Sequence, residues 1–298
     1  MISKVRRVCI FAHYDQKNTV DEYVLYYLSE LSIVTEKIIF VTVTDIGIKD
    51  ITKLKNLGVH VIKRENIGYD FYSYKVGFEN IESEEYDELI ICNDSVFGPL
   101  YPLQNIFNEM EYVECDFWGV TDSKIMSYHI QSYFIVFRKA ILVSSELKRF
   151  FSEVIVLNNK NSIIEEYEVG LSRRLIEKKY RPAVYVKYEV TASDNTMELV
   201  IRGLKNPLKI LKLFVKPMYY LSIAVSDEGN ASVSFWEKLI TQYRMPFFKK
   251  SLIMEFDGGA QRIKKLKEIM ANKVLDINYP IALIENYFKK YKEKNKYE

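Results

Sequence analysis

The amino-acid sequence predicts an α/β fold with a mainly parallel central sheet that carries helices on both faces. Two observations support this prediction. Strand-like apolar runs alternate with helical patterns through the first two-thirds of the 298-residue chain, and several runs end in polar or glycine-containing segments. Repeated β-α-β units of this kind favour parallel strands, because each crossover helix packs back onto the sheet.

The predicted elements follow from local composition. β-Branched and aromatic residues favour strands at VCIFAHY (8–14), KIIFVTVT (37–44), VHVIKR (59–64), DELIICND (87–94), the start of HIQSYFIVFRKAIL (129–142) and PAVYVKYEV (182–190). Apolar residues at helical spacing predict helices at 20–31, 51–58, 72–80, the end of 129–142 and 163–180. Gly58 is expected to close the second of these helices.

Charge and cysteine content exclude several classes of protein. The net charge of +2 gives no overall field for nucleic acid, so we expect no nucleic-acid partner. Cys9, Cys92 and Cys115 show no metal-ligand spacing and indicate reduced thiols in a cytoplasmic protein. The basic N-terminus runs into His13 and Asp15 without a cleavage site, which predicts a strand rather than a signal peptide. No stretch reaches the roughly 18 apolar residues of a membrane span, so we expect a soluble or peripheral protein.

The character of the sequence changes near residue 195. Lysines recur among apolar residues in KNPLKILKLFVKPMYYLSIAV (205–225), and the chain closes with the lysine-rich YFKKYKEKNKYE (287–298). We therefore predict a nucleotide-binding domain over residues 1–194 and a mostly helical C-terminal extension over residues 195–298. The mixture of Lys with Tyr and Phe in the tail suits an anionic membrane surface and equally a solvated tail.

The predicted sheet selects the loops that should meet a ligand. In parallel α/β sheets the ligand lies beyond the carboxyl ends of the strands. The loops at those ends are Ala12–Asp15, Thr44–Gly47, Glu65–Asp70 and Asn93–Gly98.

The segment DELIICNDSVFGPLYPL (87–103) carries the most informative of these loops. Its strand delivers Asn93, Asp94 and Ser95 to the ligand edge, and Gly98 then bends the chain away. An aspartate there can hold Mn²⁺ or Mg²⁺ together with diphosphate oxygens, and such a metal compensates the charge on a departing nucleotide diphosphate. An aspartate that caps the following turn gives the same pattern, so both interpretations stay open.

Two segments place carboxylates on predicted helices. In RENIGYDFYSYKVGF (64–78), Asp70 lies at a helix start, where it can accept hydrogen bonds from ribose or base or can cap the helix. In EEYEVGLSRRL (165–175), Glu168 can take the proton of an acceptor hydroxyl if it points into the cleft, or can belong to a solvated face.

The segment CDFWGVTDSKIMSYHIQSYF (115–134) combines aromatic, amide and hydroxyl groups, a combination that suits a sugar pocket. The residues that we expect to contact the acceptor or sugar are Trp118, Asp122, His129, Gln131 and Ser132. A structural role for the lone His129 remains open. Neither GKS/GKT nor GxSxG occurs, so P-loop and hydrolase-triad classes find no support.

Taken in order, these segments resemble the rhamnan synthesis protein F family of bacterial polysaccharide glycosyltransferases. The similarity spans about residues 5–255 and is most specific in NDSVFGPL and HIQSYF. Looser matches lie in RENIGYDFYSYKVGF, CDFWGVTDS, YEVGLSRRL and SFWEKLITQYRMPFFKKSLI.

The resemblance implies a GT-A-like fold and inverting transfer from a nucleotide-sugar donor, typically L-rhamnose carried as dTDP-L-rhamnose, to a lipid-linked glycan acceptor. It implies that Asp94 is the metal-associated aspartate and that Glu168 is the catalytic base. The residues expected near the donor are His13, Tyr14, Asp45, Asn66, Asp70 and Asn93. The expected location is cytoplasmic, peripheral at the inner face of the plasma membrane.

Two other hypotheses stay open. The same fold can use another donor, such as nucleotide-activated galactose or glucose, because pocket details decide which sugar fits. A catalytically silent module that binds glycan or acts as a scaffold is the second hypothesis. Its support is the single acidic residue, Asp94, in the NDS segment.

Overall fold

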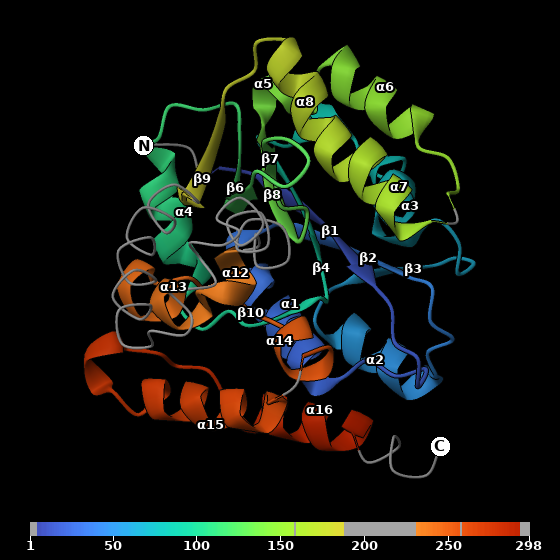
Figure 1. Ribbon diagram of the computed structural model, residues 1–298. Coiled ribbons are helices and arrows are strands. Elements are labelled where there is room, and N and C mark those ends of the chain that lie inside the picture. Colours follow the sequence, from blue (N-terminus) through green and yellow to red (C-terminus); the bar gives the residue numbers. More distant parts are fainter. Residues whose placement is uncertain (1–4, 158, 188–230, 257, 293–298) are drawn as a thin grey trace, which may run out of the picture.

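The computed structural model describes residues 5–157, 159–187, 231–256 and 258–292, and its central feature is an eight-stranded mixed sheet (Figure 1). The strands are β1 (Arg7–His13), β2 (Lys37–Thr42), β3 (His60–Lys63), β4 (Glu88–Asn93), β6 (Phe117–Ser123), β7 (His129–Ile130), β8 (Phe134–Arg138) and β9 (Pro182–Val186). Their order is β3-β2-β1-β4-β8-β6-β7, with β9 beside β6. The first four strands in this order are parallel, whereas β8 is antiparallel to both neighbours. The predicted α/β class with a mainly parallel sheet is confirmed.

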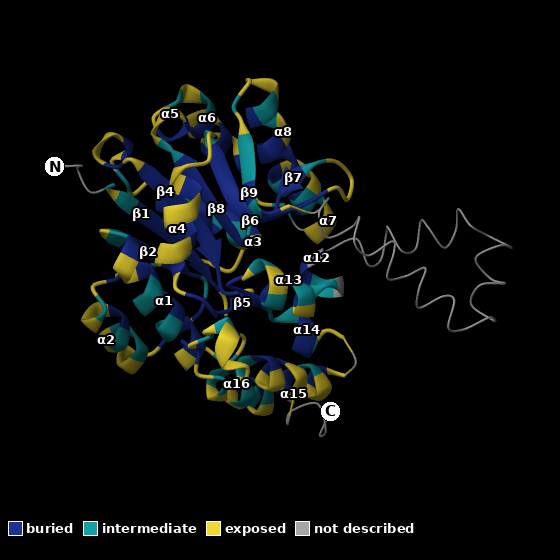
Figure 2. Cartoon of the chain, turned by 90° about the vertical axis from the view of Figure 1, so that its left-hand side faces the viewer, coloured by how far each residue is buried: buried dark blue, intermediate teal, exposed yellow. Residues whose placement is uncertain are grey.

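Helices cover both faces of this sheet (Figures 1 and 2). They are α1 (Glu22–Val34), α2 (Ile48–Asn56), α3 (Tyr69–Phe78), the short 3₁₀ helix η1 (Ser83–Glu85), α4 (Leu103–Glu111), α5 (Lys139–Leu142), α6 (Ser145–Glu153), α7 (Lys160–Ile163), the π-helical turn η2 (Ile164–Val169) and α8 (Gly170–Glu177). Side chains of a strand alternate between its two faces, so Cys9 and Phe11 enter the core shared with α1 and α4. Val8 and Ile10 enter the opposite core, shared with α3, α6 and α8.

Most predicted elements are present with small shifts at their ends. The first four predicted strands agree with β1 to β4 within two residues at each end. Gly58 follows α2 with a φ of 72°, as expected of a glycine that closes a helix. The segment 129–142 contains β7, then β8, then α5. The sequence did not predict β6, because its polar residues Thr121 and Asp122 obscure the strand pattern.

The described C-terminal residues, 231–256 and 258–292, are mainly helical. Their elements are α12 (Ala231–Ser234), α13 (Trp236–Tyr243), β10 (Phe248–Lys249), α14 (Ser251–Met254), α15 (Gly259–Met270), η3 (Lys273–Leu275) and α16 (Ala282–Lys292). The short strand β10 pairs antiparallel with β5 (Val96–Phe97), and these helices share the core that contains α1. The predicted boundary near residue 195 lies outside the described residues, so the division into two domains stays a prediction.

Gly98 permits the close approach of the C-terminal segment to β5. Its φ is 147°, and a Cβ there would lie 2.5 Å from the carbonyl oxygen of Pro246. The same carbonyl accepts a hydrogen bond from the Leu100 N–H at 2.6 Å. Residues 246–250 are therefore fixed beside the loop that follows β4.

Candidate functional site

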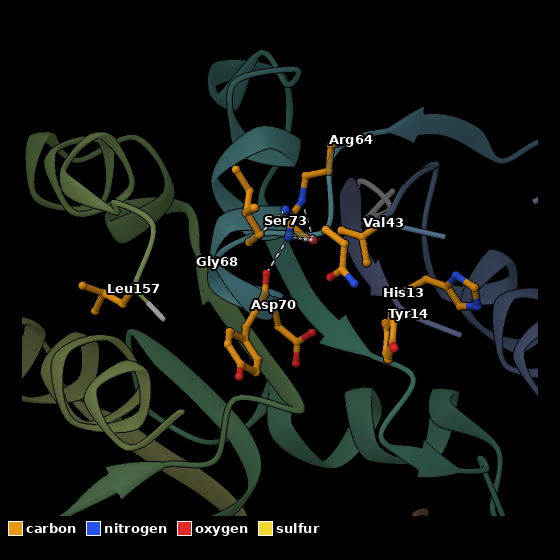
Figure 3. A pocket seen from close by; sticks show the side chains of 11 residues that line it. His13, Tyr14, Val43, Arg64, Gly68, Asp70, Ser73 and Leu157 are labelled. Atoms are coloured by element: carbon orange, nitrogen blue, oxygen red, sulfur yellow. Dashed lines mark hydrogen bonds between the residues drawn. The ribbon is translucent and has the colours of Figure 1, made fainter. Parts of the chain in front are cut away.

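A cavity of about 500 Å³ opens at the carboxyl ends of β1, β2 and β3 and at the start of α3 (Figure 3). Its lining residues are His13, Tyr14, Val43, Arg64, Asn66, Ile67, Gly68, Tyr69, Asp70, Ser73 and Leu157. This is the sheet edge at which parallel α/β folds bind ligands. Two of the four predicted loops, Ala12–Asp15 and Glu65–Asp70, contribute to the lining.

Arg64 organises the loop between β3 and α3. Its guanidinium donates to the Glu65 carbonyl at 2.8 Å and the Tyr69 carbonyl at 2.6 Å, and also to the carbonyl of Ile67. It also donates to the Ser73 hydroxyl at 2.7 and 3.0 Å (Figure 3). Burial lowers the pKa of Arg64, although the Asp70 carboxylate opposes that effect. Sequence reasoning missed Arg64, although its place directly after a strand, at a predicted ligand loop, was an available signal.

The start of α3 presents backbone to the cavity. Gly68 has a φ of 69° and precedes the helix without a side-chain cap, and Tyr69 has a φ of 54°. A Cβ on Gly68 would lie 2.8 Å from Cβ of Tyr72, so only glycine fits without a shift. The first N–H groups of an α-helix have no partner within the helix and favour anions. This wall of the cavity therefore suits a phosphate or a polar edge of a nucleotide.

Asp70 and Asn93 link the cavity to the end of β4. Nδ2 of Asn93 donates to Oδ2 of Asp70 at 2.8 Å, while Oδ1 of Asn93 accepts from the Ser95 N–H and hydroxyl at 3.1 and 2.6 Å. Burial, together with the nearby Asp94 carboxylate, raises the pKa of Asp70 to about 7. Two of the residues predicted near the donor are therefore in contact with each other.

The Asp94 carboxylate is paired with an ammonium. Its Oδ2 accepts from Nζ of Lys250 at 3.2 Å and from the Tyr23 hydroxyl at 3.4 Å. Among the described residues, no group of three or more His, Cys, Asp or Glu side chains is placed to hold a metal ion. These residues do not fit the metal site that we predicted at Asp94, because a buried cation already compensates its charge.

Lys250 was not predicted, because 156 residues separate it from Asp94 in sequence. The pairing of β10 with β5 sets its position, and its backbone N–H donates to the Ser95 carbonyl at 2.9 Å. Burial lowers the pKa of Lys250, but the Asp94 carboxylate outweighs burial, so the pKa is raised. The lysine therefore stays charged at neutral pH.

The remaining residues predicted near the donor behave differently from one another. His13 is buried with Nδ1 2.9 Å from the Thr42 hydroxyl, and burial lowers the pKa of its ring, which favours neutral imidazole. Tyr14 is half exposed, and Asn66 is exposed on the cavity wall. Asp45 lies outside the lining and forms an exposed ion pair with Lys63. The structure therefore does not support a donor contact for Asp45.

Trp118, predicted to cover a sugar, lies in the core instead. Only 1% of the residue is exposed, and its ring packs against Phe107 and Phe134 at centroid distances of 5.2 and 6.0 Å. Within the described part of the chain, its indole nitrogen has no hydrogen-bond partner. The prediction failed because Trp118 lies within β6, on the face that meets α4.

Three of the other residues predicted to bind sugar, Asp122, His129 and Gln131, are buried and have interactions within the protein. Oε1 of Gln131 accepts from the Thr121 hydroxyl at 2.6 Å and from the Ser232 hydroxyl at 3.2 Å. Nδ1 of His129 lies 2.9 Å from the Ser127 carbonyl oxygen, and Asp122 is 6% exposed on β6. None of these residues lines the cavity at the sheet edge, so we correct their role from sugar contact to internal support.

Ser132 holds the predicted base. Its backbone N–H and hydroxyl both donate to Oε1 of Glu168, at 2.7 and 3.0 Å. Glu168 lies in the π-helical turn η2, a distortion that is frequent at functional sites. The Ser132 carbonyl accepts from the Tyr74 hydroxyl at 3.1 Å, and Tyr74 belongs to α3, as does Asp70. Glu168 does not line the cavity but is joined to its helix by this chain of contacts.

Lys249, beside Lys250, is near the same carboxylate. Its Nζ lies 5.0 Å from the centre of the Tyr133 ring. Burial lowers its pKa to about 8, and the Glu168 carboxylate opposes that effect. The β10 segment thus brings one lysine toward Asp94 and another toward Glu168.

The predicted membrane-binding tail is partly packed on the protein. Tyr287 and Tyr291 of α16 are buried, and the Tyr291 hydroxyl donates to Asp15 and to Asp21. Lys290 forms an ion pair with Asp21 at 2.7 Å. Residues 293–298 lie outside the described part of the chain, in which no helix is long and apolar enough to cross a membrane. The described tail therefore offers no support for membrane binding.

Comparison with known proteins decides the family. The sequence profile of the family described as "Rhamnan synthesis protein F" matches residues 38–213, more than half of the chain. This chain belongs to the rhamnan synthesis protein F family. The resemblance read from the sequence is confirmed. The match includes Asp70, Asp94 and Glu168 but ends before Lys250.

Individual relatives are more distant. Virulence protein VirA of Vibrio anguillarum is 29% identical over 225 residues, 73% of this chain and 70% of that protein. A mannosyltransferase of Pyrobaculum calidifontis, PcManGT, solved with GDP-Man and Mn²⁺, has 8% identity and a TM-score of 0.34, covering 46% of each chain. A 4-diphosphocytidyl-2C-methyl-D-erythritol synthase of Anaerococcus prevotii has 11% identity and a TM-score of 0.40, covering 62% of this chain and 90% of that chain. Both structural likenesses are loose.

This member of the family has the predicted mainly parallel α/β sheet, and its cavity lies at the carboxyl edge of that sheet. Family and architecture together support a nucleotide-sugar-related transferase.

Proposed function

We propose that this protein is a glycosyltransferase that moves a sugar from a nucleotide-diphosphate donor to a growing cell-surface polysaccharide. The observation that carries the proposal is the cavity at the carboxyl ends of three parallel strands, in a chain of the rhamnan synthesis protein F family. Its volume of about 500 Å³ lies within the usual range for small-molecule and cofactor sites.

The nucleotide would occupy the cavity between β1 and the start of α3. His13 and Tyr14 border one side, and the loop held by Arg64 borders the other. The Asp70 carboxyl can donate or accept a hydrogen bond near neutral pH, because its pKa is about 7. The diphosphate would point toward the end of β4, where Asp94 and Lys250 lie.

Glu168 is the proposed catalytic base. The two hydrogen bonds from Ser132 fix one carboxylate oxygen, which orients the group. As an acceptor hydroxyl attacks the anomeric carbon, Glu168 takes its proton and the bond from that carbon to the diphosphate breaks. Attack opposite the leaving group inverts the configuration. L-Rhamnose is the proposed sugar, and a lipid-linked glycan is the proposed acceptor.

A donor panel tests this function. The purified protein would be incubated with lipid-linked glycan and with dTDP-L-rhamnose, UDP-galactose or UDP-glucose, and the released nucleotide would be measured. We expect acceptor-dependent release with dTDP-L-rhamnose and little with the other two. Release from a different donor would show that the protein transfers another sugar, and it would still be a glycosyltransferase. Absence of release and of nucleotide binding throughout the panel would leave the silent glycan-binding or scaffold module as the better hypothesis.

A further inference from the structure

Lys250 is enclosed at the end of β4 by groups that hold its ammonium in one place. Nζ lies 3.2 Å from Oδ2 of Asp94 and 2.9 Å from the Tyr23 hydroxyl. The rings of Tyr23 and Tyr287 lie 5.4 and 5.2 Å from the same nitrogen, within range of cation–π attraction. The side chains of Lys250 and Asp94 are only 20% and 11% exposed. This arrangement differs from a surface ion pair, in which solvent screens both charges.

Backbone contacts fix the position independently of the charge. β10 pairs with β5, and the N–H of Lys250 donates to the Ser95 carbonyl at 2.9 Å. The Tyr23 hydroxyl also donates to the Asp94 carbonyl oxygen at 3.0 Å. The ammonium of Lys250, the residue after β10, is therefore placed by α1, the loop after β4 and the Tyr287 ring of α16.

The pair adjoins the wall of the cavity. Asp94 follows Asn93 directly, and the side chain of Asn93 donates to Asp70, which lines the cavity. In the strand register, Asn93 lies opposite Ala12, one residue before the cavity residue His13. The fixed ammonium is thus joined to the cavity wall through Asp94, Asn93 and Asp70.

We propose that Lys250 is the cation that stabilises the diphosphate, so that donor binding and sugar transfer proceed without a divalent metal. This inference rests on the proposed function and names the residue that compensates the leaving group. Fixed positive groups can stabilise the charge of a departing phosphate in the same way as a metal ion. When the bond between the anomeric carbon and the diphosphate breaks, the negative charge stays on the nucleoside diphosphate, and Lys250 keeps its proton throughout.

Calorimetry with UDP, GDP and dTDP, each in EDTA and in Mn²⁺, tests the proposal on the full chain. We expect at least one nucleotide to bind with a Kd that differs less than twofold between the two conditions. Lys250→Met keeps much of the apolar stem and removes the charge, and it should weaken that binding at least tenfold. Lys265→Ala, on the exposed face of α15, is the matched control and should change the Kd less than twofold.

A double variant distinguishes a role of Lys250 in nucleotide binding from a purely structural role. Lys250→Met alone leaves the buried Asp94 carboxylate uncompensated and is expected to lower Tm. Asp94→Asn combined with Lys250→Met restores charge balance and should recover Tm, while binding stays at least tenfold weaker. Wild-type affinity in the double variant, or binding by the wild-type protein only in Mn²⁺, would overturn the proposal. Absence of binding by all three nucleotides in both conditions would reject this proposal together with the proposed function.

Discussion

Around the ends of β1, β2 and β3, polar side chains line a cavity, whereas around β6 and β7 side chains of similar kinds have hydrogen-bond partners inside the protein. We call the first region the donor edge and define it by the cavity lining. We call the second the β6–β7 network and define it by Thr121, His129, Gln131 and Ser132. Both contain polar residues near strand ends. Polar residues of the donor edge have internal partners too, such as Thr42 for His13, but they also border a cavity. A polar strand end therefore indicates a ligand site only where the fold leaves a cavity beside it.

Glu168→Gln is expected to have the largest effect, which is on the rate of transfer. Glu168 lies between the two regions, because Ser132 donates to it and Tyr74 of α3 donates to the Ser132 carbonyl. The amide keeps the size of the side chain and still accepts from Ser132, but it cannot take a proton. We expect the rate of transfer to fall about 10² to 10⁴-fold, the usual contribution of a positioned base. Single-turnover kinetics measures the rate, and calorimetry should give a donor Kd within twofold of wild type. Near-normal turnover would remove Glu168 from the mechanism.

Trp118→Ala tests the assignment of this residue to the core. Loss of the buried ring should lower the free energy of unfolding by about 3 to 5 kcal/mol, measured by urea titration. Nucleotide affinity of the folded fraction should not change. Trp118→Phe retains a ring and removes an indole N–H that has no hydrogen-bond partner among the residues the structure describes, so it should lower the free energy of unfolding less. A large loss of sugar transfer with unchanged stability would show that Trp118 contacts the sugar or the acceptor, as the sequence predicted.

Arg64→Ala tests the donor edge itself. The loop carbonyls and Ser73 lose a charged donor, so the cavity wall should loosen and nucleoside diphosphate affinity should fall about tenfold, equivalent to ~1.4 kcal/mol. The matched control is Lys63→Ala, which removes the adjacent but exposed ion pair with Asp45. Such pairs contribute little, and we expect less than a twofold change in Kd. If Arg64→Ala and Lys63→Ala lost nucleoside diphosphate affinity equally, the assignment of Arg64 but not Lys63 to the donor edge would be wrong.

Asp70→Asn should have the smallest effect on transfer, and its signature is a change in the pH dependence of stability. Burial raises the pKa of Asp70 from about 4 unfolded to about 7 folded. The folded state therefore binds the proton more tightly, and stability falls as pH rises from about 4 to about 7. An asparagine side chain does not titrate, so the variant should become more stable relative to wild type over the same pH range. Parallel curves of Tm against pH for the two proteins would show that Asp70 has an ordinary pKa.

The sequence predicted the donor edge better than the β6–β7 network for a physical reason. Strand ends and Asp70 are local features, because the apolar run stops and a turn residue such as Gly68 follows. The partners of Gln131 and Asp94 are not local. Ser232 is 101 residues from Gln131, and Lys250 is 156 residues from Asp94. Hydrophobic periodicity carries no information on such pairings, so a metal-ligand interpretation of Asp94 was reasonable from sequence alone.

The β6 strand was missed for a related reason. Alternation of apolar and polar residues identifies a strand with one solvated face, but β6 is buried over its whole length. Its Thr121 hydroxyl contacts Gln131 and Tyr133 inside the protein, and Asp122 is buried. Polar residues in a sequence are usually taken to face water or a ligand, so a strand that is buried on both faces was interpreted as a binding segment.

The pairing of β10 with β5 has a consequence for biosynthesis. It joins residues 96–97 to residues 248–249, so this part of the protein cannot close until residue 249 has left the ribosome. Contacts of such sequence separation form slowly, since a long loop must be ordered first. A shortened polypeptide that stops at residue 213 would contain all of the family-matched segment and would still leave Asp94 without its counter-charge. Premature termination would thus yield a protein that still matches the family but lacks the ion pair between Lys250 and Asp94.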